Sequence, residues 1–543
     1  MTPARVGAPR GSLPWLVGLG CLALTLLLYY PATRLRFVAD DITLVRPNPD
    51  WLRDALLPSA TNFHYFPVYQ LPLSLIPALT GWRPEVMHAL NFVLYSAVGL
   101  ALFQWLLKLD AGVFAAALAS LFFLSRGINY EVVAWVTGLG YLVVVLLTVA
   151  TCSWWYDFLR GKGRKYLAWA IAGFAGAVFT IEHGMLLLPL YLLLEWTMHP
   201  GPGGWWGLGR NAGDRSGRWG RFAGLLLRRA ARYVPFVLVV VVFMTIKLGH
   251  HGSLLSSQVG PPTAAVEPIP SGERALEALP PERMWHRVFN TPSRAYRDLL
   301  MAPSYLVLPI GTSSGADDSW LTRRASLVLL PWLALHVWLL WKGPPLARFL
   351  LGWMYLYLLP VAVASVPQAR YFFLATVPAA GLVGLGLSRL AGRLRARVPG
   401  RAPEVLAVLL LVAVAGGESV FIRARLKEWR LASDLMQQTL SDLQQDVTAG
   451  AREVYLVNFP HGVRGPYWPA YAFGVAAEHL NLMLRPPRPD LTIHPVHDRS
   501  FVEGRWPTVG AYASVEQVRG RLRPPQVVAH EFLGRPPWIQ PVN

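Results

Sequence analysis

Residues 13–30 read LPWLVGLGCLALTLLLYY and residues 142–152 read LVVVLLTVATC, and these two stretches decide the fold class. Neither contains a charged residue, and apolar side chains fill each one instead of forming the stripe of an amphipathic helix. A run of about 18 apolar residues matches the hydrocarbon thickness of a bilayer, because lipid forces the backbone to hydrogen-bond within one helix. The sequence therefore predicts membrane-spanning helices.

The composition of the whole chain agrees with this interpretation. Of 543 residues, 54% are hydrophobic and 15% are charged, whereas a soluble chain carries about a quarter charged residues. Arg5 and Arg10 precede the first apolar run as in a signal peptide, but the run is long and no cleavage site clearly follows, so we interpret it as an uncleaved span. In all, the sequence predicts an α-helical polytopic membrane protein with about eleven spans, near residues 12–30, 88–107, 111–125, 137–158, 166–181, 184–198, 232–249, 325–341, 347–363, 371–388 and 405–421.

The basic residues behind the net charge of +19 are concentrated on one side of the predicted topology. Segments 159–165, 199–231 and 389–404 are basic and nearly free of acids, and alternating spans place all three on the side of the N-terminus. The positive-inside rule makes that side cytoplasmic. The basic residues do not indicate nucleic-acid binding, because the sequence shows no basic groove with stacking aromatic residues. The Arg-rich, Lys-poor composition and the lack of Asn-x-Ser/Thr sequons indicate a bacterial inner membrane.

An odd number of spans places the C-terminus on the opposite, periplasmic side. Residues 1–421 form the predicted transmembrane domain, and residues 422–543 form a small α/β domain. It begins with an amphipathic helix from Ile422 to Val447 and continues with strand-like runs at 453–459 and 491–496 and a helical stretch near 470–484. The run 68–79 is short and contains two prolines, so we expect it to lie along the interface or to re-enter.

Two adjacent carboxylates, Asp40 and Asp41, follow the first span in the string RFVADDIT, residues 36–43. Neighbouring carboxylates raise each other's cost of ionisation, which suits them to bind a cation or to take a proton from a hydroxyl group. The alternative is a solvated turn with an acid at the start of a helix, which is common for Asp.

Several short motifs carry a resemblance to a known superfamily. In chain order they are FVADD (37–41), HYFPV (64–68), HALN (88–91), NYEVVAW (129–135), EH (182–183) and QARYFF (368–373). In this order, with a soluble domain after the last span, the chain resembles the GT-C superfamily of membrane glycosyltransferases, such as protein O-mannosyltransferases and lipid A aminoarabinose transferases. The resemblance covers most of residues 12–421.

The resemblance implies roles for particular residues. An Asp of the first external loop acts there as general base or as ligand to a divalent metal, Mg or Mn, and this role falls to Asp40 or Asp41. The second acidic position corresponds to Glu131, which with Asp41 is the implied metal ligand. A cation must meet the negative charge that develops on the departing lipid phosphate, and Arg370 is the candidate for this role.

The remaining candidates surround these residues or depart from the superfamily pattern. Relatives commonly have Arg before the Pro of HYFPV, where this chain has Phe66, so His64 is the alternative donor contact. Relatives often carry Lys-Glu where this chain has Glu182-His183. Gln368 and Tyr371 flank Arg370. An Arg at a membrane interface otherwise serves as a snorkelling anchor, and Glu182 otherwise faces water in a turn.

The resemblance thus implies an inverting glycosyltransferase that moves a sugar from a polyprenyl-phosphate carrier to a lipid, glycan or protein acceptor on the periplasmic side of the cell envelope. A membrane transporter or lipid flippase is one alternative, although transporters are commonly built from repeated halves and this chain shows no repeat. A non-catalytic scaffold of a polysaccharide assembly complex is another.

Overall fold

The computed structural model describes residues 13–39, 41–45, 51–57, 65–198, 229–251, 334–364, 369–398 and 400–460. In the C-terminal part it also describes residues 462–463, 470–473, 480–481, 483–484, 486, 488–497, 511–533 and 537–542.

Most of the described chain is helical, and its helices overlap the predicted spans, although residues 325–333 of the span predicted at 325–341 lie outside the described residues. These helices are α1 (Leu13–Tyr29), α5 (Pro84–Lys108), α6 (Val113–Ser125), α8 (Leu139–Leu159), α9 (Arg164–Val178), α10 (Leu187–Met198), α12 (Val234–His251), α16 (Pro345–Ala364), α17 (Ala369–Arg395) and α18 (Ala402–Ala449), with a further helix at residues 334–342. Within the described residues, five helices are long and apolar enough to cross a membrane, and six if α6 and the chain that bends away from it by 56° form one broken span. This is the architecture of a polytopic membrane protein.

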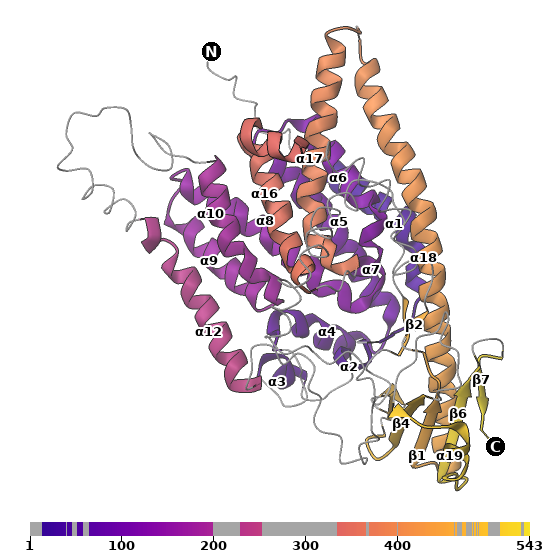
Figure 1. Cartoon of the computed structure of the whole chain (residues 1–543). Coiled ribbons are helices and arrows are strands. Elements are labelled where there is room, and N and C mark those ends of the chain that lie inside the picture. The colour runs from indigo at the N-terminus through magenta and orange to yellow at the C-terminus, as the bar shows by residue number, and fades with distance from the viewer. Residues whose placement is uncertain are drawn as a thin grey trace.

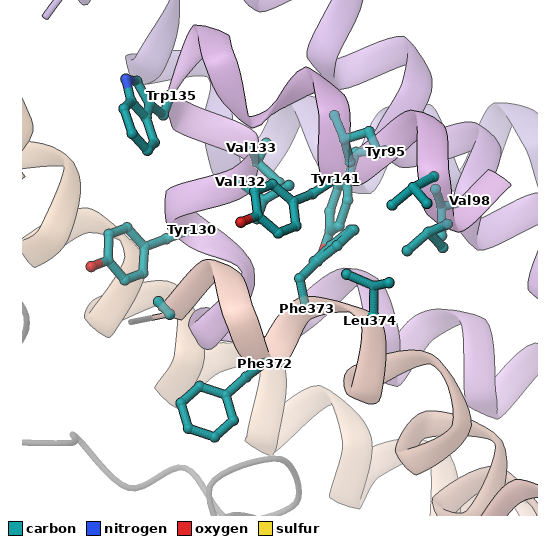
Figure 2. Close-up of a cluster of buried hydrophobic side chains, with 14 of the residues drawn as sticks. Tyr95, Val98, Tyr130, Val132, Val133, Trp135, Tyr141, Phe372, Phe373 and Leu374 are labelled. Carbon is teal, nitrogen blue, oxygen red and sulfur yellow. The ribbon is translucent and has the colours of Figure 1, made fainter. Parts of the chain in front are cut away.

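The core lies among α5, α6, α8 and α17, where aromatic rings pack among aliphatic side chains. Tyr95 of α5 contacts the rings of Phe123 and Phe373 at centroid distances of 5.2 and 6.3 Å. Figure 2 shows how Phe373 and Leu374 point from α17 toward the side chains of the neighbouring helices. Leucines and valines of α1 and α18 are instead exposed on the surface, as expected for side chains that face lipid.

Two helical connections lie at the end of the bundle that also carries the C-terminal sheet (Figure 1). The first contains η1 (Tyr30–Arg34), α2 (Asp41–Leu44), α3 (Trp51–Leu56) and α4 (Pro67–Thr80), so the proline-containing run 68–79 is helical. The second, predicted as a short external loop, is a buried chain of short helices: η2 (Gly127–Asn129), α7 (Tyr130–Ala134) and η3 (Val136–Gly138). The basic turn between α17 and α18 lies at the opposite end of the bundle.

The C-terminal sheet has the strand order β5-β4-β1-β6-β7, in which β7 alone is antiparallel to its neighbour. Its strands are β1 (Glu453–Val457), β4 (Thr492–His497), β5 (Ala511–Tyr512), β6 (Val527–Phe532) and β7 (Ile539–Pro541), with α19 (Val515–Arg519) before β6. The helix predicted near 470–484 is wrong at its start, because Ala470–Tyr471 is strand β3 and pairs with β2, Gly462–Val463. The predicted last span and the predicted amphipathic helix are one continuous 48-residue helix, α18. This helix continues across residue 421, where the predicted transmembrane domain ends.

Candidate functional site

Asp41 is buried at the start of α2, where it ties the two connections together. Its Oδ2 accepts a hydrogen bond from the backbone N–H of Val38 at 3.1 Å, and its Oδ1 accepts one from the N–H of Thr137 at 3.0 Å. The carboxylate therefore fixes the first connection against the second, which is an anchoring role. Asp40 and His64 lie outside the described residues.

The backbone just before Asp40 is held in an unusual conformation. Ala39 has a φ of 48°, in the left-handed region that costs a residue with a Cβ about 1 kcal/mol or more. Its N–H donates a hydrogen bond of 2.7 Å to the carbonyl of Ala472 in the C-terminal domain. Strain of this kind persists only where the surroundings enforce it, and it is typical of functional sites.

The HALN motif braces the same two connections from α5. His88 Nε2 lies 3.3 Å from the carbonyl oxygen of Leu35, and Asn91 Nδ2 donates to the carbonyl of Trp135 at 2.8 Å. Both side chains are buried. These motif residues are therefore structural supports of the site.

Glu131 and Arg370 form an ion pair between α7 and the first turn of α17. The Arg370 guanidinium lies 2.5 Å from Glu131 Oε1, and the Arg370 backbone N–H donates to Oε2 at 3.1 Å. The side chain of Glu131 is 2% exposed and that of Arg370 is 14% exposed. The chain thus brings together two residues that sequence reasoning assigned to one site, while Gln368 lies outside the described residues.

Aromatic rings surround this pair. The guanidinium carbon of Arg370 lies 4.9 Å from the ring centroid of Trp135 and 5.1 Å from that of Tyr371. Tyr371 in turn stacks on His183 at 6.3 Å, and Tyr141 contacts both rings. Burial lowers the pKa of His183, and Glu182 only partly opposes this effect, so the site favours the neutral form of this imidazole.

Glu182 is paired with a lysine that sequence reasoning missed. Lys247 Nζ, near the end of α12, lies 2.6 Å from Glu182 Oε1, and the same ammonium lies 5.9 Å from the ring centroid of Phe66. The turn is therefore not simply solvated. Lys247 thus supplies a cation beside Phe66 and Glu182, the two places where the motifs differ from those the resemblance implies. Its charge within the apolar helix 234–251 was the signal available in the sequence.

The described carboxylates do not fit the implied Mg or Mn ion. Both oxygens of Asp41 accept backbone N–H groups, and both oxygens of Glu131 accept hydrogen bonds from Arg370. Throughout the described part of the chain, no group of three or more His, Cys, Asp or Glu side chains could hold a metal ion.

No model of a protein family matches the chain, and no curated protein sequence matches it.

Proposed function

We propose that this chain is an inverting glycosyltransferase that moves a sugar from a polyprenyl-phosphate donor to a lipid, glycan or protein acceptor on the periplasmic side of a bacterial inner membrane. In this proposal the chain crosses the membrane about eleven times, with the N-terminus in the cytoplasm. The observation that carries the proposal is the Glu131–Arg370 pair, which adjoins the anchored Asp41 through residues 135–137. A charge pair at the end of an apolar bundle is costly to maintain without a function.

In the proposed reaction, Asp40 takes the proton of the acceptor hydroxyl group as its oxygen bonds to the anomeric carbon. The bond between the anomeric carbon and the phosphate oxygen breaks, and the polyprenyl phosphate leaves with the electron pair. Asp41 holds the backbone next to this base, which accounts for its buried and fully engaged oxygens. The two neighbouring Asp residues thus take different roles, base and anchor.

Arg370 and Lys247 bind the phosphate of the donor. Each is neutralised by one carboxylate, Glu131 or Glu182, which keeps the cations paired near lipid until the phosphate binds. Ring contacts lead from His183, which follows Glu182, to Tyr371 and then to Arg370, and we propose that both cations border one region. The aromatic rings of Trp135 and Tyr371 orient the guanidinium.

The lipids of a strain from which the gene is deleted test this proposal. A transferase predicts that a polyprenyl-phosphate sugar accumulates, and that the wild-type gene, but not Asp40→Asn, removes it. If no sugar-linked polyprenyl lipid accumulates, the proposal is wrong. If Asp40→Asn complements fully, the chain acts as a transporter or a scaffold and not as a transferase.

A further inference from the structure

One face of α18 contacts both connections that carry the site. Glu418, Phe421, Arg425, Trp429 and Ser433 recur at steps of three and four residues, so they lie on the same side of the helix. All of them are buried or half-buried. Two residues on other sides of the same stretch, Arg430 and Asp434, have side chains that are 59% and 68% exposed.

The contacts of this face, which we call the α18 stripe, follow the second connection residue by residue. Glu418 pairs with Arg126 and accepts a hydrogen bond from the backbone N–H of Gly127 at 2.8 Å. Both Phe421 and Arg425 contact Tyr130, the residue before Glu131. The ring centroids of Phe421 and Tyr130 lie 6.0 Å apart, and Arg425 donates a hydrogen bond of 3.0 Å to the Tyr130 hydroxyl.

The stripe continues along the second connection to Trp135 and then reaches the first connection at Arg36. The rings of Trp429 and Trp135 lie 5.9 Å apart, and the Ser433 hydroxyl accepts a hydrogen bond of 2.7 Å from the backbone N–H of Arg36. The contacts from Glu418 to Ser433 span 15 residues, or about 22 Å of one helix at 1.5 Å per residue. A single rigid element therefore spaces the segments that carry Asp41 and Glu131.

The same helix carries the C-terminal sheet to this site. His530 of β6 lies 2.5 Å from Asp446 near the end of α18. Phe459, which follows β1, packs on Phe473 at 5.2 Å, and the neighbouring Ala472 accepts the hydrogen bond from Ala39. The C-terminal domain thus contacts the backbone before Asp40 through Ala472, and α18 contacts the same segment at Arg36 through Ser433.

We infer that the α18 stripe and the C-terminal sheet act together as a positioning element, in which Ser433 and Trp429 set the spacing of the two connections. This inference rests on the proposed transferase function. Neither residue is a candidate catalytic residue, because each acts through the backbone or ring of another residue. The C-terminal domain is accordingly part of the active site's framework and not an independent appendage.

Hydrogen–deuterium exchange and kinetics of the full-length protein in detergent test the inference with Ser433→Ala, Ser433→Thr and the surface control Asp434→Ala. Ser433→Ala removes the acceptor of the Arg36 N–H, so exchange should rise in peptides that cover 35–45, whereas Ser433→Thr keeps the hydroxyl and should resemble wild type. The kcat for sugar transfer should fall about tenfold, which is less than the roughly hundredfold loss that a misplacement of about 1 Å can cause, with KM for the donor lipid nearly unchanged.

Trp429→Phe provides a second variant, for which exchange should rise at 127–138. Unchanged exchange in both segments in folded Ser433→Ala and Trp429→Phe would overturn the inference, whatever the activity. A fall in kcat with Asp434→Ala as large as that with Ser433→Ala would also overturn it. Absence of transfer by the wild type, with the exchange changes as expected, would instead contradict the proposed function alone.

Discussion

Arg370 holds Glu131 through two different nitrogens, one in its guanidinium and one in its backbone. The two residues are 239 positions apart, so this pair joins the second connection to the start of α17. The backbone contact fixes the position of the helix start, and the side-chain contact fixes the guanidinium. A substitution of Arg370 by any residue except proline therefore removes the guanidinium contact but keeps the backbone hydrogen bond.

Removal of the Arg370 charge should affect stability and transfer separately. Arg370→Gln leaves a buried carboxylate without its cation, and loss of one partner of a buried pair costs about 3–5 kcal/mol. The double variant Arg370→Gln, Glu131→Gln should recover most of that stability, as measured by thermal unfolding in detergent, yet should not transfer sugar. Recovery of transfer in the double variant would contradict the role of Arg370 in phosphate binding.

The two neighbouring aspartates should respond differently to the same substitution. Asp41→Asn replaces one acceptor oxygen by an NH₂ group that faces a backbone N–H, which should cost about 1–3 kcal/mol of stability. Asp40→Asn should leave the unfolding temperature unchanged and abolish transfer. Unfolding and transfer assays on the two variants decide this, and equal loss of stability in both would show that the division of roles is wrong.

Lys247→Met should weaken donor binding because it removes a cation but keeps the length of the side chain. We expect KM for the donor to rise about tenfold, or about 1.4 kcal/mol, with little change in kcat. Lys342→Met is the control, since Lys342 follows a span whose end is predicted to be cytoplasmic. An unchanged KM for Lys247→Met would exclude this lysine from the donor site.

Gly127→Ala should destabilise the junction of α6 and α18. A Cβ at Gly127 would lie 2.3 Å from Glu418 Oε2 and 2.6 Å from the ring of Phe421, so these buried or half-buried side chains, or the helix that carries them, must shift. Overpacking of this kind costs about 1–3 kcal/mol. Gly416→Ala on α18 is the matched control, because no atom lies within 4 Å of its added Cβ. Unfolding temperatures that fall equally in both variants would contradict the tight contact.

The sequence was sufficient to predict the helical membrane architecture, because long apolar runs have no other stable solution in lipid. It was less informative about the connections. Residues 126–136 were expected in a short external loop, yet they are buried because Arg126 and Glu131 each find an oppositely charged partner. The start of the helix predicted near 470–484 was misassigned because a short apolar run does not distinguish strand from helix.

The pairing of site residues depended on tertiary contacts that no local pattern contains. The resemblance named Glu131 and Arg370 separately, but their direct contact follows from how α17 packs against α7. Lys247 was missed because a single lysine near the end of an apolar run also fits a snorkelling anchor. The sequence could not distinguish the roles of Asp40 and Asp41, because the distinction rests on the hydrogen bonds of Asp41 to two backbone N–H groups.

The most direct test of the central claim uses purified full-length protein in liposomes that contain polyprenyl-phosphate sugars extracted from the deletion strain. With a membrane extract from that strain as the source of acceptor, wild-type protein should release free polyprenyl phosphate and form a new glycosidic bond, and Asp40→Asn should do neither. Movement of intact donor lipid between leaflets at equal rates in both proteins, with no bond cleaved, would contradict the transferase account.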